Sequence, residues 1–484
     1  MRTGQQYIAS IKDERRIYVD GKKIESVLEA PGFHGIVKTI AQLYDFAADP
    51  KNGMTYTAPE TGQAANRVFA IPRSREDLAL KRTASAAWAR QTHGLVGRSP
   101  DHVGAFMAAF ASDPGFFDAP GRPLGKNVTA FYRKMLVEDL YLSYAIIPPQ
   151  IDRSKTAQSL EEKFLQVGVV KETDGGVIVR GAQMLGTAST ICNYILVSCI
   201  VPLKPGDEDY ANTFVVPAGA PGLKLYCRPL YAQGKSSVYD YPLSTRFDET
   251  DALLVFDDVF IPWEQVFVYR DVERVRNQFF ATPAHVLGNT QAQVRLCAKM
   301  EFLAGLARKI AAVNQIDSMP GVMEKLGELA SLASIVEGMV LAAEASCALD
   351  KNGVAKSNPR FLYGAMGLQA ELIPRALGIL RELAGGGVLQ VPSSFHELLA
   401  DETAADMARY IRSPGVSAEE RIKLFRLVWD MVGTEFGGRH HQYEMFYAGA
   451  PYVAKGYAFR NYGYDSALKL VNDCMAKYSP STDM

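Results

Sequence analysis

The segment GVIVRGAQML (residues 176–185) decides the fold, because apolar residues alternate along it in the pattern of a half-buried β-strand. Four further short stretches of this kind follow, and Gly, Pro and Asp punctuate the chain between them. These stretches are YILVSCIV (194–201), TFVVP (213–217), LKLYC (223–227) and ALLVF (252–256). We therefore expect a central β domain, of barrel or sandwich type, over residues 146–272.

The segments on either side of this block repeat their apolar residues at helical spacing. They include GIVKTIAQLYDFAA (35–48), NVTAFYRKMLVEDLYLSYAI (127–146) and TQAQVRLCAKMEFLAGLARKIAAV (290–313). We expect a helical domain over residues 1–145 and a helical bundle over 273–484, which makes the fold α+β. Bundles of this size commonly bury faces against sister subunits. The order of helices, strands and helices is similar to that of acyl-CoA dehydrogenases, which hold flavin between the β domain and the bundle.

The composition is that of an ordinary globular protein, with 52 Lys and Arg against 53 Asp and Glu in 484 residues. No run of basic residues would attract nucleic acid, which is therefore not an expected partner. No stretch approaches a membrane span in unbroken apolar length, and the N-terminus lacks the apolar core of a signal peptide, so we expect no membrane association and a cytoplasmic location. The six cysteines are scattered without zinc spacing, so we expect no metal site.

The segment HGLVGRSPDHVGAF (93–106) is the most informative one for chemistry. Ser99 before Pro100 predicts a helix start, which places Arg98 and His102 on either side of it. An arginine there binds a phenolate or a carboxylate through charge-assisted hydrogen bonds, and a histidine exchanges a proton near neutral pH. The residues alone leave a second interpretation open, in which an exposed arginine and a solvated histidine lie on the first turn.

The segment GTEFGGRHHQYEMFYAG (433–449) combines small and cationic residues. Gly437 and Gly438 would let the backbone approach a ligand closely, and Arg439 could contact a phosphate. The two adjacent histidines that follow would diverge by roughly 100° on a helix, so they cannot both face one metal ion. A ligand-binding role without metal is the interpretation that this segment favours.

Six segments occur in a characteristic order along the chain. They are GRSPDH (97–102), PPQIDR (148–153), DYPLSTRFDE (240–249), DDVFIPWE (257–264), VPSS (391–394) and GTEFGGRHHQYE (433–444). Together they resemble the large oxygenase component of 4-hydroxyphenylacetate 3-hydroxylase, and the similarity runs from about residue 4 to 478. The resemblance implies an FADH2-dependent aromatic monooxygenase, usually a homotetramer, that receives FADH2 from a separate NAD(P)H:flavin reductase. Such enzymes hydroxylate a para-substituted phenol ortho to its hydroxyl with O2, through a flavin C4a-hydroperoxide.

The resemblance also implies which residues meet the substrate. Arg98 matches the family arginine, while the position that is usually tyrosine is His102 and the family's active-site histidine is Tyr144. The two residue types are thus exchanged between the two positions, which places the identity of the phenol in doubt. His285 lies near the position of a histidine base in chlorophenol enzymes. A helix-start histidine in solvent is the competing interpretation of His285.

For flavin, the resemblance points to the PPQIDR turn, to a threonine near flavin nitrogen 5 and to the FGGRH segment. The residues are Pro149, Gln150, Asp152, Arg153, Thr187, Gly437, Gly438 and Arg439. A loop at about Gln233 to Tyr241 would fold over the substrate. From the residues alone, an ordinary strand threonine is the favoured interpretation of Thr187.

Four alternatives remain open at this stage. Within the family, the protein could be a chlorophenol or nitrophenol monooxygenase, or a hydroxylase of a tyrosine-like group in natural-product synthesis. Outside the family, it could be an acyl-CoA dehydrogenase or a non-catalytic flavin carrier. An iron–sulfur dehydratase of the same superfamily is disfavoured, since no cysteine precedes Cys192 and the first helical domain therefore has no thiolate ligand.

Overall fold

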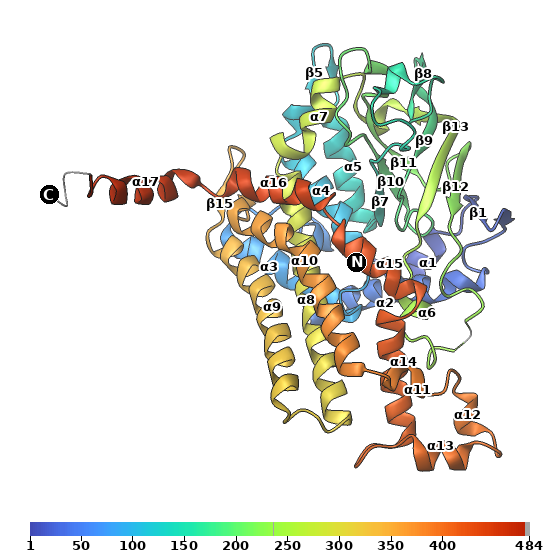
Figure 1. Ribbon diagram of the computed structural model, residues 1–484. Coiled ribbons are helices and arrows are strands. Elements are labelled where there is room, and N and C mark those ends of the chain that lie inside the picture. The colour runs from blue at the N-terminus through green and yellow to red at the C-terminus, as the bar shows by residue number, and fades with distance from the viewer. Residues whose placement is uncertain (236, 480–484) are drawn as a thin grey trace.

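The computed structural model describes residues 1–235 and 237–479, and helices at both ends of the chain surround two β-sheets (Figure 1). The N-terminal helices are α1 (Gly4–Ser10), α2 (His34–Ala48), α3 (Arg75–Gln91), α4 (Pro100–Ser112) and α5 (Gly125–Glu138). Aromatic side chains hold them together: Tyr7 and Tyr44 stack with ring centroids 5.3 Å apart, and the edge of Trp88 meets Tyr44. The indole N–H of Trp88 donates to the Leu43 carbonyl, so this large side chain is buried without an orphaned donor.

The β domain is a sandwich of a six-stranded and a four-stranded sheet. The larger sheet has the order β2-β1-β12-β13-β9-β8, and the smaller has the order β14-β11-β10-β7. Phe214 of the smaller sheet meets Phe256 of the larger at right angles, with centroids 6.1 Å apart. The strands are β1 (Arg16–Val19), β2 (Lys22–Ile24), β7 (Leu142–Ala145), β8 (Gly168–Thr173), β9 (Gly176–Gln183), β10 (Tyr194–Val197), β11 (Thr213–Pro217), β12 (Leu223–Cys227), β13 (Ala252–Pro262) and β14 (Val266–Val268).

Short two-stranded ribbons complete the β structure outside the sandwich. They are formed by β3 (Thr55–Thr57) with β4 (Ala64–Asn66), β5 (Asp118–Ala119) with β6 (Arg122–Pro123), and β15 (Ala348–Leu349) with β16 (Ala355–Lys356). One further short helix, α6 (Ser244–Phe247), precedes β13.

Three strands of the sandwich, β1, β2 and β7, come from the region that the sequence predicts to be helical. β1 pairs in parallel with β12, and its burial alternates over only four residues, too few to stand out in the sequence. β7 lies within the predicted helix 127–146, but α5 ends at Glu138 because Asp139 takes a left-handed conformation with φ 51°. The chain then pairs in parallel with β10. Tertiary pairing has overridden local helical periodicity here, and it places Tyr144 on a strand.

The C-terminal part is a bundle with two projections. Its helices are α7 (Val272–Ala281), α8 (Ala284–Val313), α9 (Pro320–Ala345), α10 (Pro359–Ala384), α11 (Gly387–Gln390), α12 (His396–Leu399), α13 (Ala404–Tyr410), α14 (Ala418–Val432), α15 (Glu435–Met445), α16 (Pro451–Asn461) and α17 (Tyr464–Met475). In Figure 1, α11 to α13 extend below the bundle and α17 extends from its side as an arm. The arrangement of helices, sandwich and bundle confirms the expected α+β class.

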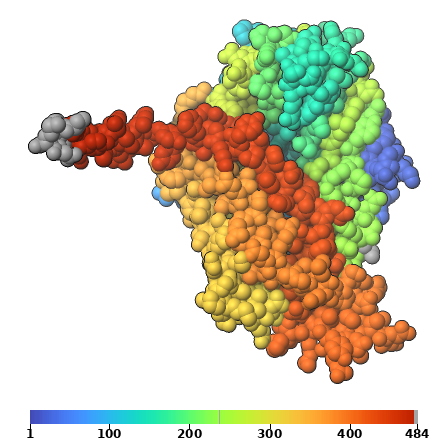
Figure 2. Space-filling model, in the orientation of Figure 1, coloured from blue at the N-terminus to red at the C-terminus, as the bar shows by residue number. Residues whose placement is uncertain are grey.

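Helix α9 differs from the expectation drawn from the sequence. Charges are sparse along it, and an 18-residue window has a mean hydropathy of 1.5, so its length and composition would suit a membrane crossing. One such helix is weak evidence for a membrane. Only 22% of that window is buried in this chain, and α9 lies at the surface of the space-filling view in Figure 2. α9 packs against α8 and α10 with Leu329 and Val336 buried, whereas Met323, Ile335 and Leu341 are exposed. Part of its apolar surface is therefore left uncovered within one copy of the chain.

Candidate active site

Arg98 lies immediately before α4 and points into the protein, with only 8% of its surface exposed. Its backbone N–H donates to Glu249 Oε1 at 2.5 Å. Its guanidinium carbon lies 5.1 Å, 5.4 Å and 4.2 Å from the ring centroids of Tyr144, Tyr443 and Tyr447. Nη1 of Arg98 has no hydrogen-bond partner among the described residues. A buried cation in an aromatic cage with a free donor is suited to an anionic or strongly polar ligand.

His102 occupies the first turn of α4 and is 3% exposed, so the solvated alternative does not describe it. Nδ1 lies 3.1 Å from Gln291 Oε1, while Nε2 is buried without a partner among the described residues. Burial, and then the positive charge of Arg98, lowers the pKa of His102 well below its ordinary value. The imidazole is therefore neutral at pH 7 and can accept a proton.

Tyr144 completes the group of substrate residues that the sequence predicts. Its ring lies 5.5 Å from the ring of His102 and 6.1 Å from that of Phe106, between centroids. The structure thus brings Arg98, His102 and Tyr144 together from α4 and β7. The three side chains thus place a cation, a neutral imidazole and a phenol ring side by side.

Two further tyrosines of this site were missed from the sequence. Tyr443 belongs to α15, and Tyr447 lies in the turn that follows the end of this helix at Met445. The Tyr447 hydroxyl donates to the Gly97 carbonyl at 3.0 Å, whereas the Tyr443 hydroxyl is buried with no partner in the described chain. Burial raises the pKa of Tyr447 to about 12. The two rings meet at right angles, with centroids 5.2 Å apart, although Tyr447 lies beyond the end of α15.

Two hydrogen bonds, one to its backbone carbonyl and one from its side-chain hydroxyl, hold Thr187 beside the same site. Its carbonyl accepts from the Ser143 hydroxyl at 2.6 Å, next to Tyr144, and its own hydroxyl donates to Asp251 Oδ1 at 2.8 Å. Arg439 also contacts Asp251 at 2.8 Å and Glu249 at 3.3 Å. Burial favours the neutral acid, but Arg439 and Arg228 outweigh it and hold the pKa of Asp251 at about 2.

The Arg439 guanidinium is therefore paired with two carboxylates of the protein. The sequence suggested that it would contact a phosphate instead. The close approach at Gly437 is likewise made to protein, since a Cβ there would lie 2.4 Å from the Met431 carbonyl oxygen. A Cβ at Gly438 would meet nothing within 4 Å. Of the FGGRH segment, Gly438 alone has open space beside its backbone.

The PPQIDR turn is open to solvent. It follows a bridge between Ile147 and Met184, so the turn and the segment leading to Thr187 run side by side. Ile151 is 55% exposed and Leu185 is 57% exposed, which leaves apolar surface uncovered beside Thr187. Within the turn, Pro149 is half-buried and Arg153 is exposed. The Gln150 amide donates to the Pro148 carbonyl. Asp152 accepts from the Ser154 N–H and pairs with Lys155.

His285 lies in a different cluster. Its Nδ1 is 2.9 Å from the Tyr363 hydroxyl, and its ring stacks on Phe280 and contacts Tyr457. Burial lowers the pKa of His285 to about 4. In the described part of the chain, no ring contact or hydrogen bond joins it to Arg98, His102 or Tyr144, so the structure does not bring it to them.

A buried ion cluster supports the site from the bundle side. Glu444 accepts two hydrogen bonds from Arg295, at 2.6 Å and 2.7 Å, and one from Lys299 at 2.8 Å. The Arg295 guanidinium carbon also lies 4.8 Å from the centroid of the Tyr447 ring. Arg295 and Lys299, four residues apart in the helix 290–313, were the sequence signal for this cluster.

Among the described residues, three hydrogen bonds join the predicted substrate loop, Gln233 to Tyr241, to the bundle. In one of them, Arg426 Nε donates to the Asp240 carbonyl at 3.0 Å. The Tyr239 hydroxyl donates to the Glu419 carbonyl at 2.7 Å, and Asp240 accepts from the Phe395 N–H at 2.9 Å. Residue 236 of this loop lies outside the described residues.

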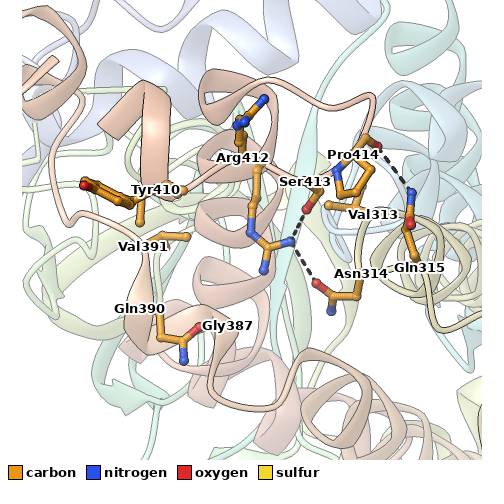
Figure 3. A pocket seen from close by; sticks show the side chains of 12 residues that line it. Val313, Asn314, Gln315, Gly387, Gln390, Val391, Tyr410, Arg412, Ser413 and Pro414 are labelled. Atoms are coloured by element: carbon orange, nitrogen blue, oxygen red, sulfur yellow. Dashed lines mark hydrogen bonds between the residues drawn. The ribbon is translucent and has the colours of Figure 1, made fainter. Parts of the chain in front are cut away.

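A polar pocket of about 300 Å³ lies elsewhere, at the end of α8 (Figure 3). Arg421 crosses it and donates to Asn314 Oδ1 at 2.9 Å and to Ser413 Oγ at 2.6 Å. None of the residues that line it belongs to the Arg98 cluster. Within residues 1–235 and 237–479, no group of three or more His, Cys, Asp and Glu side chains is arranged to hold a metal ion.

Two family models that together span nearly the whole chain establish which class of protein it is. The model of the 4-hydroxyphenylacetate 3-hydroxylase N-terminal region matches residues 3–268, and that of the C-terminal region matches residues 275–476. The chain belongs to the 4-hydroxyphenylacetate 3-hydroxylase family.

Individual relatives are similar over nearly their whole length. The chain is 34% identical to the 4-hydroxyphenylacetate 3-monooxygenase oxygenase component of Pseudomonas aeruginosa, covering 98% of this chain and 93% of the relative. It is 34% identical to a Streptomyces globisporus monooxygenase of a carrier-bound 3-amino-3-(3-chloro-4-hydroxyphenyl)propanoyl group, covering 92% and 85%. A solved 4-hydroxyphenylacetate 3-monooxygenase oxygenase component, complexed with FAD and 4-hydroxyphenylacetate, superposes with a TM-score of 0.93 at 31% identity over 99% of both chains.

Glu444→Gln tests the ion cluster. The variant leaves Arg295 and Lys299 buried without their anion, so we expect it to lose about 3–5 kcal/mol of unfolding free energy at pH 7. Arg295 and Lys299 outweigh the effect of burial and hold the pKa of Glu444 at about 2, below its unfolded value of about 4.3. The stabilisation is therefore present above that unfolded value and lost as the pH falls towards 2.

Urea unfolding at pH 7 and at pH 3 measures this loss. The parent should lose more stability between the two pH values than Glu444→Gln does. Lys469→Ala, which removes a surface pair with Asp473, is the control and should change little. Equal acid sensitivity of parent and Glu444→Gln would contradict a structural role for the cluster.

Proposed function

We propose that this protein is the oxygenase component of a two-component, FADH2-dependent monooxygenase that hydroxylates a para-substituted phenol ortho to its hydroxyl. The observation that carries the proposal is the free Nη1 of Arg98 beside the free Nε2 of His102, both buried. Orphaned polar atoms in a buried site call for a ligand that satisfies them. A phenolic oxygen does so, because it accepts from Arg98 and gives its proton to His102.

The residues present also fit a flavin. Thr187 is buried two residues after the exposed Leu185, and a Cβ at Gly438 would meet nothing within 4 Å. The PPQIDR turn and Thr187 would hold the ring system, and Arg439 would act by fixing Asp251, the acceptor for the Thr187 hydroxyl. When bound, the reduced flavin supplies, with O2, the oxygen atom that is transferred.

The chain's own residues then prepare the phenol. Arg98 stabilises negative charge on the phenolic oxygen, which raises electron density at the ortho carbon. His102 is neutral and accepts the phenolic proton at Nε2. The Tyr144 ring lies against both side chains, and its hydroxyl would donate a hydrogen bond to the same oxygen. The aromatic cage excludes water from the reacting carbon.

A second substrate class within the family is favoured by one observation, the exchange of histidine and tyrosine between positions 102 and 144. This substrate class comprises nitrophenols, chlorophenols and tyrosine-like groups, including groups held on a carrier protein as in the Streptomyces relative. A panel of free and carrier-bound phenols, assayed with FADH2 and O2 and read by mass spectrometry, distinguishes this substrate class from 4-hydroxyphenylacetate-like phenols.

We further propose that the enzyme is a homotetramer that works in the cytoplasm with a separate NAD(P)H:flavin reductase. Apolar surface on α9 and α17 supports association, since Met323, Leu468 and Leu470 are more than half exposed. All six cysteines are free thiols, as expected in a reducing compartment. The description of similar proteins as oxygenase components supports a separate reductase.

His102→Ala and Tyr144→Phe test the substrate site. We expect His102→Ala to lower hydroxylation by about 10²–10⁴-fold, the usual effect of removing a general base, with oxidation of FADH2 retained and hydrogen peroxide released in place of product. Tyr144→Phe should have a smaller effect in the same direction. Stopped-flow oxidation of FADH2 with product and peroxide quantification measures the coupling. Parent-like coupling in both variants would remove these residues from the phenol and make His285 the next base to test.

Arg439→Ala tests the flavin site. Loss of the two carboxylate pairs should release Asp251 from Thr187 and weaken FADH2 binding by roughly 1.5–3 kcal/mol, which is about 10–150-fold in Kd. Anaerobic titration with FADH2 measures the change, and a thermal melt checks folding. Arg270→Ala, which removes a surface pair with Asp209, is the matched control. Unchanged FADH2 affinity in Arg439→Ala would exclude Arg439 from the site.

Leu468→Asp combined with Val471→Asp tests the arm α17. Both side chains are more than half exposed in one copy, at 55% and 53%, and charges there would oppose burial against a second copy. Light scattering should report fewer copies than in the parent. Lys477→Ala is the control and should leave the mass unchanged. A tetramer that persists in the double variant would show that α17 is not part of the interface.

A further inference from the structure

Gln291, on α8, makes a hydrogen bond with His102 in which donor and acceptor can be assigned from the chemistry of the two side chains. Its side-chain oxygen Oε1 lies 3.1 Å from His102 Nδ1, and both side chains are buried. An amide oxygen only accepts hydrogen bonds, so Nδ1 must carry the proton. In a neutral imidazole, that leaves Nε2 bare.

The orientation of the Gln291 amide is itself fixed. Its nitrogen Nε2 lies 3.1 Å from Asp101 Oδ1 and 3.4 Å from Ser99 Oγ. The Ser99 hydroxyl donates to the same Asp101 oxygen at 2.5 Å. A carboxylate cannot donate, so the amide must turn its NH2 group to Asp101 and its oxygen to His102.

The Tyr447 hydroxyl supports the same tautomer. It donates its proton to the Gly97 carbonyl at 3.0 Å, so its oxygen is an acceptor where it comes within 3.5 Å of His102 Nδ1. Two acceptors therefore face Nδ1. In contrast, Nε2 has no partner among the described residues.

We propose that Gln291, oriented by Asp101, is a positioning residue that holds His102 in its Nδ1–H tautomer so that the bare Nε2 receives the substrate's phenolic proton. The inference rests on the proposed function for the identity of the proton donor. It assigns the tautomer independently of any substrate. The arrangement places a glutamine and a carboxylate where many catalytic histidines have a carboxylate in direct contact.

Solution NMR of 15N-histidine-labelled protein, without flavin or substrate, tests the tautomer. A protonated and a bare ring nitrogen differ widely in 15N shift, and His102→Gln identifies the signals of this residue among the seven histidines. We expect Nδ1 protonated and Nε2 bare in the parent. Gln291→Met removes the acceptor and should give a mixture of tautomers. Gln291→Glu, with its second oxygen protonated against Asp101, keeps an acceptor oxygen at His102 and should restore the parent pattern.

Hydroxylation is the second readout. Gln291→Met should lower product formed per FADH2 oxidised by about 10-fold or more, and Gln291→Glu should recover most of it. Gln293→Leu is the matched control, because Gln293 is buried two residues further along α8 and donates to Gln369. It should leave the His102 spectrum as in the parent.

The outcomes separate this inference from the proposed function. A parent spectrum with Nε2 protonated, or a Gln291→Met protein with parent tautomer and parent coupling, would overturn the inference. A protein that shows the expected tautomer but hydroxylates no phenol would overturn the proposed function and the role of Nε2 in it. Should Gln291→Met fail to fold, the parent and Gln291→Glu spectra still decide the tautomer.

Discussion

The carboxylate of Glu249 joins the three parts of the chain at one point. It is fully buried in the turn before β13, accepts the backbone N–H of Arg98 from the start of α4, and pairs with Arg439 of α15. A buried carboxylate without such partners would carry a large desolvation cost, so the N-terminal helices, the sandwich and the bundle must meet with these groups in register. The position of the Arg98 guanidinium follows from this constraint, because its backbone is held at Glu249.

The tyrosines around Arg98 show how strongly this environment opposes negative charge. Burial is the largest cause of the raised pKa of both Tyr443 and Tyr447, even though Arg98 acts in the opposite direction. A phenol that enters the same cage experiences the same desolvation. It therefore needs direct contact with the cation and a proton acceptor at its own oxygen to ionise, and the free Nη1 and Nε2 atoms provide both.

Local sequence patterns were sufficient for part of this structure. The alternation in 176–185 and 252–256 predicts the long strands β9 and β13, and Ser99-Pro100 predicts the start of α4 with Arg98 and His102 together. Strand β7 was assigned to a helix, because its pairing with β10 lies in the tertiary structure and not in its own periodicity.

The remaining site residues come from distant parts of the chain. Gln291 is separated from His102 by 189 residues, and Tyr447 by 345. Nothing in the local pattern of either segment specifies these contacts. The family resemblance supplied Thr187 and Arg439, but their shared partner Asp251 depends on the loop conformation before β13 and was not foreseen.

The two faces of strand β7 make different contacts. Ser143 turns to the carbonyl of Thr187, on the side proposed for flavin, whereas Tyr144, the next residue, turns to Arg98 and His102. Side chains alternate along a strand, so pairing of Ser143 with Ile195 and of Tyr144 with Leu196 fixes these two side chains on opposite faces. A substitution at Tyr144 can thus remodel the substrate side without moving the cofactor side, whereas one residue inserted between Asp139 and Leu142 would exchange the two.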